Sequence, residues 1–174
     1  MDQFKKQESL KPYFAKSYGC CVFETIAKAG FGVGGAGGKG AVYLLKDGTE
    51  ELVGHSTMFQ LSFGFQLGGQ MYSEIIFFET EPDYKHFISD NFEFGAEANV
   101  VALTASAKAS ISTLGNQGVT AGVTAGETKV PQTALQYTKG MAVFTITLGG
   151  LMYEATVKGQ RFHYMPLTAA TDTM

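Results

Sequence analysis

A glycine-dense stretch, GFGVGGAGGKG at residues 30–40, is the part of the chain most readily linked to chemistry, because such loops bind nucleotide phosphates. Gly30, Gly32 and Gly35 satisfy the dinucleotide pattern G-x-G-x-x-G. That pattern requires a helix opening inside it, but here an apolar run, AVYLL, and a hairpin follow. A Walker A motif also fails, because Val33 stands where its first glycine should be. The glycines are instead expected to let strands cross closely or to admit a headgroup to backbone N–H groups.

Other side chains with catalytic or metal-binding potential form no recognisable constellation. The three histidines are far apart in the sequence, with no H-E-x-x-H motif or Cys/His cluster, and adjacent Cys20 and Cys21 are expected to be buried free thiols. Four carboxylates cluster at Glu74, Glu79, Glu81 and Asp83. We expect them to be exposed at a strand-to-helix turn, and not to form an acid/base pair. The sequence thus predicts no enzyme, no metal site and no cofactor.

The net charge of −3 hides an uneven distribution along the chain. Residues 1–46 carry seven lysines against three acids, whereas residues 47–97 carry ten acids against one lysine. This pattern favours an orientation of the basic part towards an anionic partner, although an ordinary solvated surface explains it equally well. A nucleic-acid-binding surface would be more basic, so no nucleic-acid partner is expected. Electrostatic attraction of six lysines to a membrane, reduced by nearby acids, amounts to about 4–5 kcal/mol, or roughly millimolar binding.

The elements that must position these groups begin with a helical segment. Residues 2–18 are predicted to be helical in two pieces, the first capped by Asp2 and the second with Pro12 in its first turn. Gly19 is expected to end the segment. Its weakly amphipathic pattern favours packing on the body of the domain over lying in a membrane.

Hairpins follow from residue 22 onward. Strands are predicted at 41–45 and 51–57 around a glycine-containing loop at 46–50. Residues 58–70 alternate, with Phe59, Leu61, Phe63, Phe65 and Leu67 on one side and Gln60, Ser62, Gly64, Gln66 and Gly68 on the other. Residues 74–78 read as a strand buried on both sides or as a helix segment, and Pro82 starts a short helix over 81–90 with Tyr84, Phe87 and Ile88 inward.

The second half of the chain is less regular. Residues 94–112 are compatible with a strand or a helix, and 113–133 are expected to be a solvent-side hairpin or loop. Three strands then close the chain: 141–148, 151–157 after a Gly149-Gly150 turn, and 160–166 after a Lys158-Gly159 turn.

These elements predict an α+β domain with a Gly-rich, mainly antiparallel β-sheet that can be curved or barrel-like, an N-terminal helical segment and a short mid-chain helix. We expect a single domain over 1–174, with a helical segment at 1–18, a β-rich body at 19–165 and a tail at 166–174. The chain shows no signal peptide or spanning segment, so we expect a soluble protein, cytoplasmic or peripheral to a membrane, and a periplasmic or exported one if a native leader has been removed.

Several motifs, in order from about residue 10 to 165, resemble the SYLF domain family, also called the Ysc84 actin-binding domain family, in its bacterial branch. They are Tyr18-Gly19, VFETIAKAGFGVGGAGGKGAVY (22–43), STMFQLSFGFQLGGQMYSEIIFF (56–78), NFEFGAEA (91–98) and KGMAVFTITLGGLMYEATVKGQRFHY (139–164). The resemblance implies a lipid-binding module: eukaryotic members bind phosphoinositides through basic residues and an amphipathic N-terminal segment, and some fungal members bind actin. Bacteria generally lack phosphoinositides, so it implies an anionic phospholipid here and makes actin doubtful.

The resulting prediction is a non-enzymatic module that recognises anionic phospholipid headgroups at a membrane surface. Lys28 and Lys39, inside the shared glycine-rich block, would supply charge, and the amides of that block would contact phosphate: Gly34, Gly35, Gly37 and Gly38. The N-terminal lysines Lys5, Lys6, Lys11 and Lys16 match the family's basic segment loosely, and the side chains expected to insert are Phe4, Tyr13 and Phe14. The alternatives are a protein-interaction or scaffold module, including a homo-oligomer, and a carrier of an apolar ligand among the Phe-rich strands.

Overall fold

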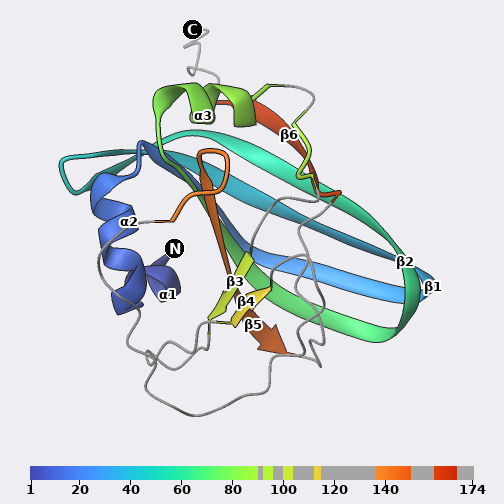
Figure 1. Ribbon diagram of the computed structural model, residues 1–174. Helices are drawn as coiled ribbons and strands as arrows, with labels where there is room; N and C mark the ends of the chain where they lie inside the picture. The colour runs from blue at the N-terminus through green and yellow to red at the C-terminus, as the bar shows by residue number, and fades with distance from the viewer. Residues whose placement is uncertain (90–91, 96–99, 104–111, 115–135, 150–158, 168–174) are drawn as a thin grey trace, which may run out of the picture.

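The structure is a computed structural model that describes residues 1–89, 92–95, 100–103, 112–114, 136–149 and 159–167 (Figure 1). The helical elements are α1 (Asp2–Lys5), the 3-10 turn η1 (Glu8–Leu10), α2 (Lys11–Lys16) and α3 (Glu81–Phe87). The strands are β1 (Gly19–Lys46), β2 (Thr49–Phe78), β3 (Val100–Leu103), β4 (Ser112–Leu114), β5 (Met141–Gly149) and β6 (Arg161–Pro166).

The described strands form one mixed sheet in the order β1-β2-β5-β3-β4, and β6 pairs with β2. All pairs are antiparallel except β3 with β5, which is parallel. With the short helices at the N-terminus and in mid-chain, this is the α+β class that the sequence predicts. The division into a helical segment, body and tail stays a prediction.

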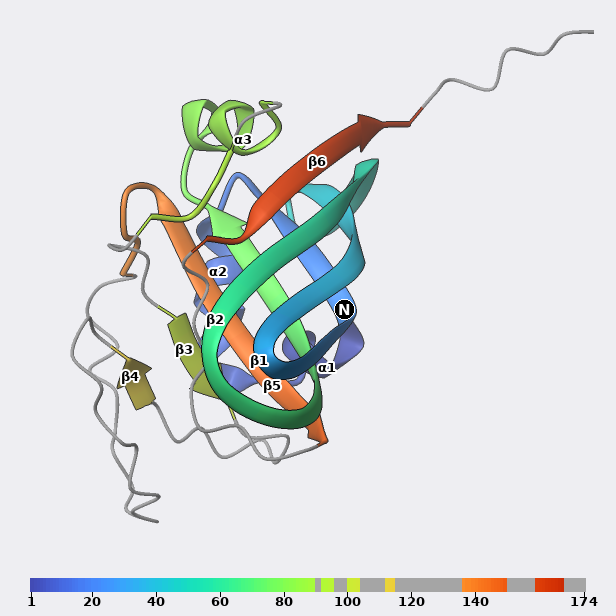
Figure 2. The same ribbon diagram turned by 90° about the vertical axis from the view of Figure 1, so that its right-hand side faces the viewer.

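The long hairpin of β1 and β2 dominates the sheet. A two-residue turn, Asp47-Gly48, joins the strands, and both of its residues have positive φ (49° and 77°), as tight hairpin turns require. The pairing register shifts three times, between Phe23 and Ile26, Phe31 and Val33, and Val42 and Tyr43. Such bulges bend a strand and increase its twist, and the hairpin accordingly curls back on itself (Figure 2).

The curl brings the two ends of β1 together. The Leu45 N–H donates to the Tyr18 carbonyl oxygen over 3.0 Å. A Cβ atom built on Gly19 would lie 2.7 Å from the Tyr43 carbonyl oxygen, so this residue must be a glycine where the backbones meet. Gly19 therefore begins β1, whereas the sequence prediction made it the stop of the preceding helix.

Two hydrophobic clusters lie on opposite faces of the sheet. The larger contains Phe23, Ile76, Phe87 and Phe162 on the inner, concave side of the curl. The second contains Ile75, Phe77 and Phe144 and is covered by Phe4 and Leu10 of the N-terminal segment. Residues 74–78 are fully buried because they lie in β2 between β1 and β5, with a cluster on each face; of the two predicted alternatives, the strand is correct.

The alternation in the middle of β2 is confirmed where side chains are described, and it points the apolar residues outward. Met58 and Gln60 are buried, while Phe59 and Leu61 are 54% and 55% exposed. The concave side of a curled hairpin has little room. Opposite this part of β2, β1 contributes small residues, with Ala36 paired to Gln60 and Gly38 to Met58. The side chains of Ser62, Phe63, Gly64, Phe65, Gln66, Leu67 and Gly68 lie outside the described set.

The remaining element predictions divide into confirmed and wrong ones. Pro12 lies in the first turn of α2, and Pro82 in that of α3, whose Thr80 and Asp83 form a capping box. Asp2 is not a cap, because α1 is preceded by Met1 and has no side-chain capping bond. Within 94–112, the described parts at 100–103 and in β4 are strands. The hairpin or loop predicted at 113–133 begins inside β4, and the rest of it, from residue 115 onward, falls outside the described residues. So do residues 150–158, which hold the predicted strand and half of each predicted turn.

Candidate functional site

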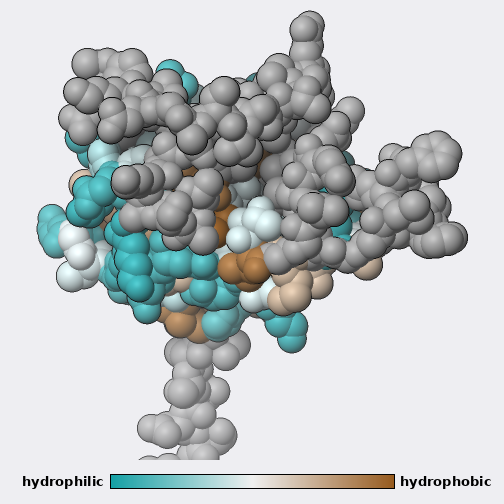
Figure 3. All heavy atoms as spheres, turned by 90° about the horizontal axis from the view of Figure 1, so that it is seen from below, coloured by the Kyte–Doolittle hydropathy of each residue, from teal (hydrophilic) through white to brown (hydrophobic). Residues whose placement is uncertain are grey.

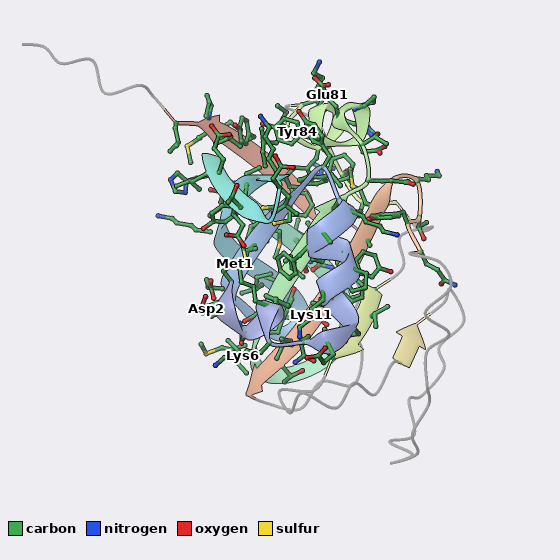
Figure 4. All side chains as sticks on the ribbon, turned by 90° about the vertical axis from the view of Figure 1, so that its left-hand side faces the viewer. Met1, Asp2, Lys6, Lys11, Glu81 and Tyr84 are labelled. Carbon is green, nitrogen blue, oxygen red and sulfur yellow. The ribbon has the colours of Figure 1, made fainter. Side chains whose placement is uncertain are left out.

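The four predicted N-terminal lysines are all exposed, but two of them form ion pairs. Lys5 contacts Glu50 at 2.5 Å, and Lys11 contacts Glu8 at the same distance. Figure 4 shows the segment in front of the sheet, with Lys6 and Lys11 towards its lower end. Ion pairing reduces the charge available to an anionic ligand, so Lys6 and Lys16 are the better candidates for headgroup contacts.

The aromatic side chains expected to insert into a membrane instead face the sheet. Phe4 is fully buried in the second cluster. The Tyr13 ring lies 4.9 Å from that of Phe144, and the Phe14 ring lies 5.0 Å from that of Phe77, both edge-on. Their insertion would require the helical segment to leave the sheet, so this docked structure does not present them to a membrane.

The two lysines of the glycine block lie on opposite faces of β1. Lys28 is only 9% exposed and follows the burial pattern of Ile26, whereas Lys39 is exposed. An odd spacing of eleven residues along a strand produces this result, because successive side chains alternate between faces. Lys28 and Lys39 therefore do not form one cationic pair, and Lys39 is the one that a ligand outside the sheet can reach.

The glycine block is a strand, with no loop at the positions predicted to cradle phosphate. Gly34, Gly35, Gly37 and Gly38 all pair with residues of β2. In an antiparallel ladder every second residue directs its N–H to the partner strand, so only some of these amides remain for a ligand. A Cβ atom on Gly38 would lie 2.8 Å from the Thr25 carbonyl oxygen, which supports close strand crossing as one reason for the glycines.

Pairing of β2 with both β1 and β6 brings Lys39 beside groups that the sequence reasoning missed. One cross-strand row joins Lys39, Thr57 and His163, and the next joins Gly37, Phe59 and Arg161. We call the outer side of these three strands around the two rows, at residues 35–41, 55–61 and 161–165, the β1–β2–β6 face. Its exposed side chains are Lys39, His55, Phe59, Leu61, Arg161, His163 and Met165. The alternation in FQLSF and RFHYM was the available signal, because it separates an outward from an inward set in each strand.

Charge on the β1–β2–β6 face is mainly basic within the described residues. The Arg161 Nε donates to Glu93 Oε2 over 3.0 Å, so this guanidinium is partly neutralised. Lys39 forms no ion pair with another described residue. Seen from below, the described surface is largely hydrophilic and carries separate hydrophobic patches (Figure 3).

Glu74 is a second candidate functional residue, and the prediction that it is exposed is wrong. Its side chain is fully buried, and its Oε2 accepts a hydrogen bond of 3.0 Å from Gln160 Nε2, while its Oε1 has no hydrogen-bond partner among the described residues. Burial raises the Glu74 pKa to about 7, and the Gln160 bond opposes that shift. Burial also raises the pKa of the neighbouring Cys21 thiol, which disfavours the thiolate needed of a nucleophile. Cys20 and Cys21 are buried and free, as predicted.

In the described part of the chain, no three His, Cys, Asp or Glu side chains gather so that they could hold a metal ion. No helix there has the length and apolar character needed to cross a bilayer.

Comparison with known proteins places the chain in a family. The family model of Ysc84, described as "Las17-binding protein actin regulator", matches residues 59–163, which is more than half of the chain. "Beta cell expansion factor A" of Aeromonas veronii is 26% identical over 159 residues, 91% of this chain and 50% of the relative, so the chain spans about half the length of that protein. No solved structure matches. The family is one of lipid- or actin-related binding modules and is not known as enzymatic. The chain belongs to the Ysc84 (SYLF) family, as its motifs predict.

Proposed function

We propose that this domain binds anionic phospholipid headgroups at a membrane surface and catalyses no reaction. The observation that carries the proposal is the exposed Lys39 on a sheet face that also exposes Phe59 and Leu61. A cation beside apolar side chains matches the boundary between headgroups and acyl chains. Family membership supports a lipid- or actin-related binding role in general, and the choice of an anionic phospholipid is the finer part of the proposal.

Electrostatic attraction alone would hold the domain only weakly on an anionic membrane. Lys6, Lys16 and Lys39 are exposed, and each lysine near an anionic bilayer contributes about 1 kcal/mol. A sum of about 3 kcal/mol is weaker than millimolar binding, so apolar contacts or several copies of the domain are needed as well. Binding should therefore fall with salt without vanishing completely, because salt screens the charges and leaves apolar contacts unaffected.

Co-sedimentation with vesicles tests the proposal. Vesicles of phosphatidylcholine alone and of phosphatidylcholine with phosphatidylserine should be compared over a range of salt. We expect the protein to pellet with the anionic vesicles at low salt; equal recovery with both vesicle types, or with neither, contradicts the proposal.

Charge reversal of Lys39 locates the contact. Lys39→Glu removes one favourable charge and adds an unfavourable one, so binding should weaken by about 2 kcal/mol, or roughly 30-fold. Lys46→Glu, at an exposed position at the hairpin end of β1, changes net charge equally and is the matched control, since Lys46, like Lys39, has no ion pair with another described residue. Equal losses would assign the effect to net charge. Reversal of Lys28 is unsuitable, because a nearly buried position reports on folding.

The alternative of an apolar-ligand carrier receives less support. Aromatic rings on the concave side pack against one another, with Phe87 and Phe162 centroids 4.9 Å apart and Phe92 and Phe94 centroids 5.1 Å apart. These contacts are those of a filled core. Self-assembly and actin binding remain alternatives that the vesicle experiment does not address.

A further inference from the structure

The β1–β2–β6 face combines the two most exposed large apolar side chains of the described residues. Leu61 and Phe59 are 55% and 54% exposed, and Met165, on the adjoining strand, is 46% exposed. They project from the same side as Lys39 and Arg161, because residues paired across an antiparallel ladder share a face. Burial of such side chains is favourable, so a contiguous exposed set marks an interaction surface.

Glycines keep this face open. Phe59 pairs with Gly37, and Leu61 pairs with Gly35, so each large side chain has no side chain opposite it on β1. Packing does not require these two glycines, because a Cβ atom on either would only reach ordinary contact at 3.6 Å with a backbone oxygen of β2. Gly35 and Gly37 thus differ from Gly38, whose added Cβ would collide with the backbone.

We infer that the β1–β2–β6 face is the surface that enters an anionic bilayer, with Phe59 and Leu61 as its main apolar side chains and the N-terminal helical segment remaining docked on the sheet. The inference rests on the proposed lipid binding and adds the face that performs it. The described acid at this face, Glu93, is already paired with Arg161, which leaves Lys39 to meet anionic headgroups. In contrast, the apolar side of the N-terminal segment is occupied by its own contacts, as Phe4 shows.

The chain contains no tryptophan, so a single one introduced at a chosen position reports on its own surroundings. Phe59→Trp places the probe on the β1–β2–β6 face, and Ala15→Trp places it at an exposed position on α2. Vesicles of phosphatidylserine and brominated phosphatidylcholine should quench the first tryptophan and shift its emission to the blue, while leaving the second nearly unchanged. Quenching confined to Ala15→Trp would overturn the inference and favour entry of the helical segment.

Removal of the apolar side chains gives an independent measurement. The double variant Phe59→Ser/Leu61→Ser loses two half-exposed apolar side chains, so vesicle partitioning should fall by roughly 30-fold. Met71→Ser/Leu148→Ser is the matched control, because these residues are 48% and 46% exposed on β2 and β5, outside this face. Equal partitioning of the two double variants would overturn the inference. Thermal unfolding should confirm that both are folded.

These outcomes separate the inference from the proposed function. If the wild-type protein pellets with anionic vesicles and the two double variants behave alike, lipid binding stands and the assigned face is wrong. If the wild-type protein pellets with no vesicle, the proposed function fails, and the inference fails with it. In that case a protein partner becomes the better occupant of the exposed face.

Discussion

Glu74 offers the sharpest test of how the sheet is held together. It lies near the C-terminal end of β2, opposite Phe23 on β1 and Thr145 on β5. Its carboxyl group is fully buried, with one described hydrogen-bond donor, Gln160. Replacement by glutamine keeps nearly the same shape and the acceptor for Gln160, and it removes the possibility of a negative charge. We therefore predict that Glu74→Gln stabilises the fold at neutral and alkaline pH.

The magnitude follows from the pKa. Burial raises the Glu74 pKa from 4.5 to about 7, a change that corresponds to about 3 kcal/mol at 1.36 kcal/mol per unit. Because the folded state holds the proton more tightly than the unfolded state, this stabilisation is complete below about pH 4.5 and is lost as the pH rises to about 7. Glu74→Gln does not lose stability over this pH range in this way, because glutamine does not titrate. Local relaxation around a buried charge lowers the figure, so we expect a gain of about 1–3 kcal/mol at pH 8 relative to pH 5.

Urea unfolding at several pH values measures this prediction. The free energy of unfolding of Glu74→Gln minus that of the wild-type protein should grow from pH 5 to pH 8. Thr145→Val is the control, since Thr145 is the cross-strand neighbour of Glu74 and its Oγ1 has no hydrogen-bond partner in the described part of the chain. Thr145→Val changes packing at the same place without removing a titrating group. The difference between its free energy of unfolding and that of the wild-type protein should therefore hardly vary with pH. A difference for Glu74→Gln that stays constant across this range would refute the reasoning.

Two further predictions concern glycines and use matched pairs. Gly38→Ala should lower the free energy of unfolding by about 1–3 kcal/mol, because its Cβ would lie 2.8 Å from a backbone oxygen. Gly37→Ala should change the free energy of unfolding by less than about 0.5 kcal/mol. Urea denaturation compares the two variants, and equal effects would contradict the strand-crossing argument. Gly48 and Gly140 both have positive φ, so alanine should cost about 1–2 kcal/mol at either, but at Gly140 the methyl group would also collide with the Asp83 carboxylate. Thermal melting should therefore rank Gly140→Ala clearly below Gly48→Ala, and the reverse ranking would be incompatible with this packing.

The local patterns of the sequence predict strands and turns well, because they depend on neighbours in the chain. Asp47-Gly48 lies between two apolar runs, and the hairpin forms there, with a loop shorter than predicted. Alternation around Phe59 and Gln60 identifies a strand with two unlike sides. It does not say which side faces the core, because that depends on the direction in which the hairpin curls. The three register shifts that set the curl carry no clear signal in a single sequence.

Glu74 shows a similar limit. Its neighbours in the sequence, at 79–83, do occupy an exposed turn and helix, and proximity in sequence led to the same expectation for Glu74. Glu74 precedes that turn by five residues, which in an extended strand is a distance of roughly 16 Å. Glu79 therefore lies at the rim of the sheet, while Glu74 lies inside it. The apolar run after it, IIFF, was the better guide, because a strand buried on both faces buries every side chain that it carries.

The glycine block explains why residue type alone could not assign the candidate site. Its glycines alternate between the two faces of β1, and the space available for a side chain differs between these faces. On the inner face, Gly38 and Gly40 allow the curled halves of the strand to approach, since a Cβ atom on either would lie within 3.0 Å of backbone or ring atoms. On the outer face, Gly35 and Gly37 have room for a methyl group and leave Leu61 and Phe59 uncovered. A composition count treats these positions as equivalent, whereas pairing and curvature make the first set a requirement of the fold and the second a property of the exposed surface.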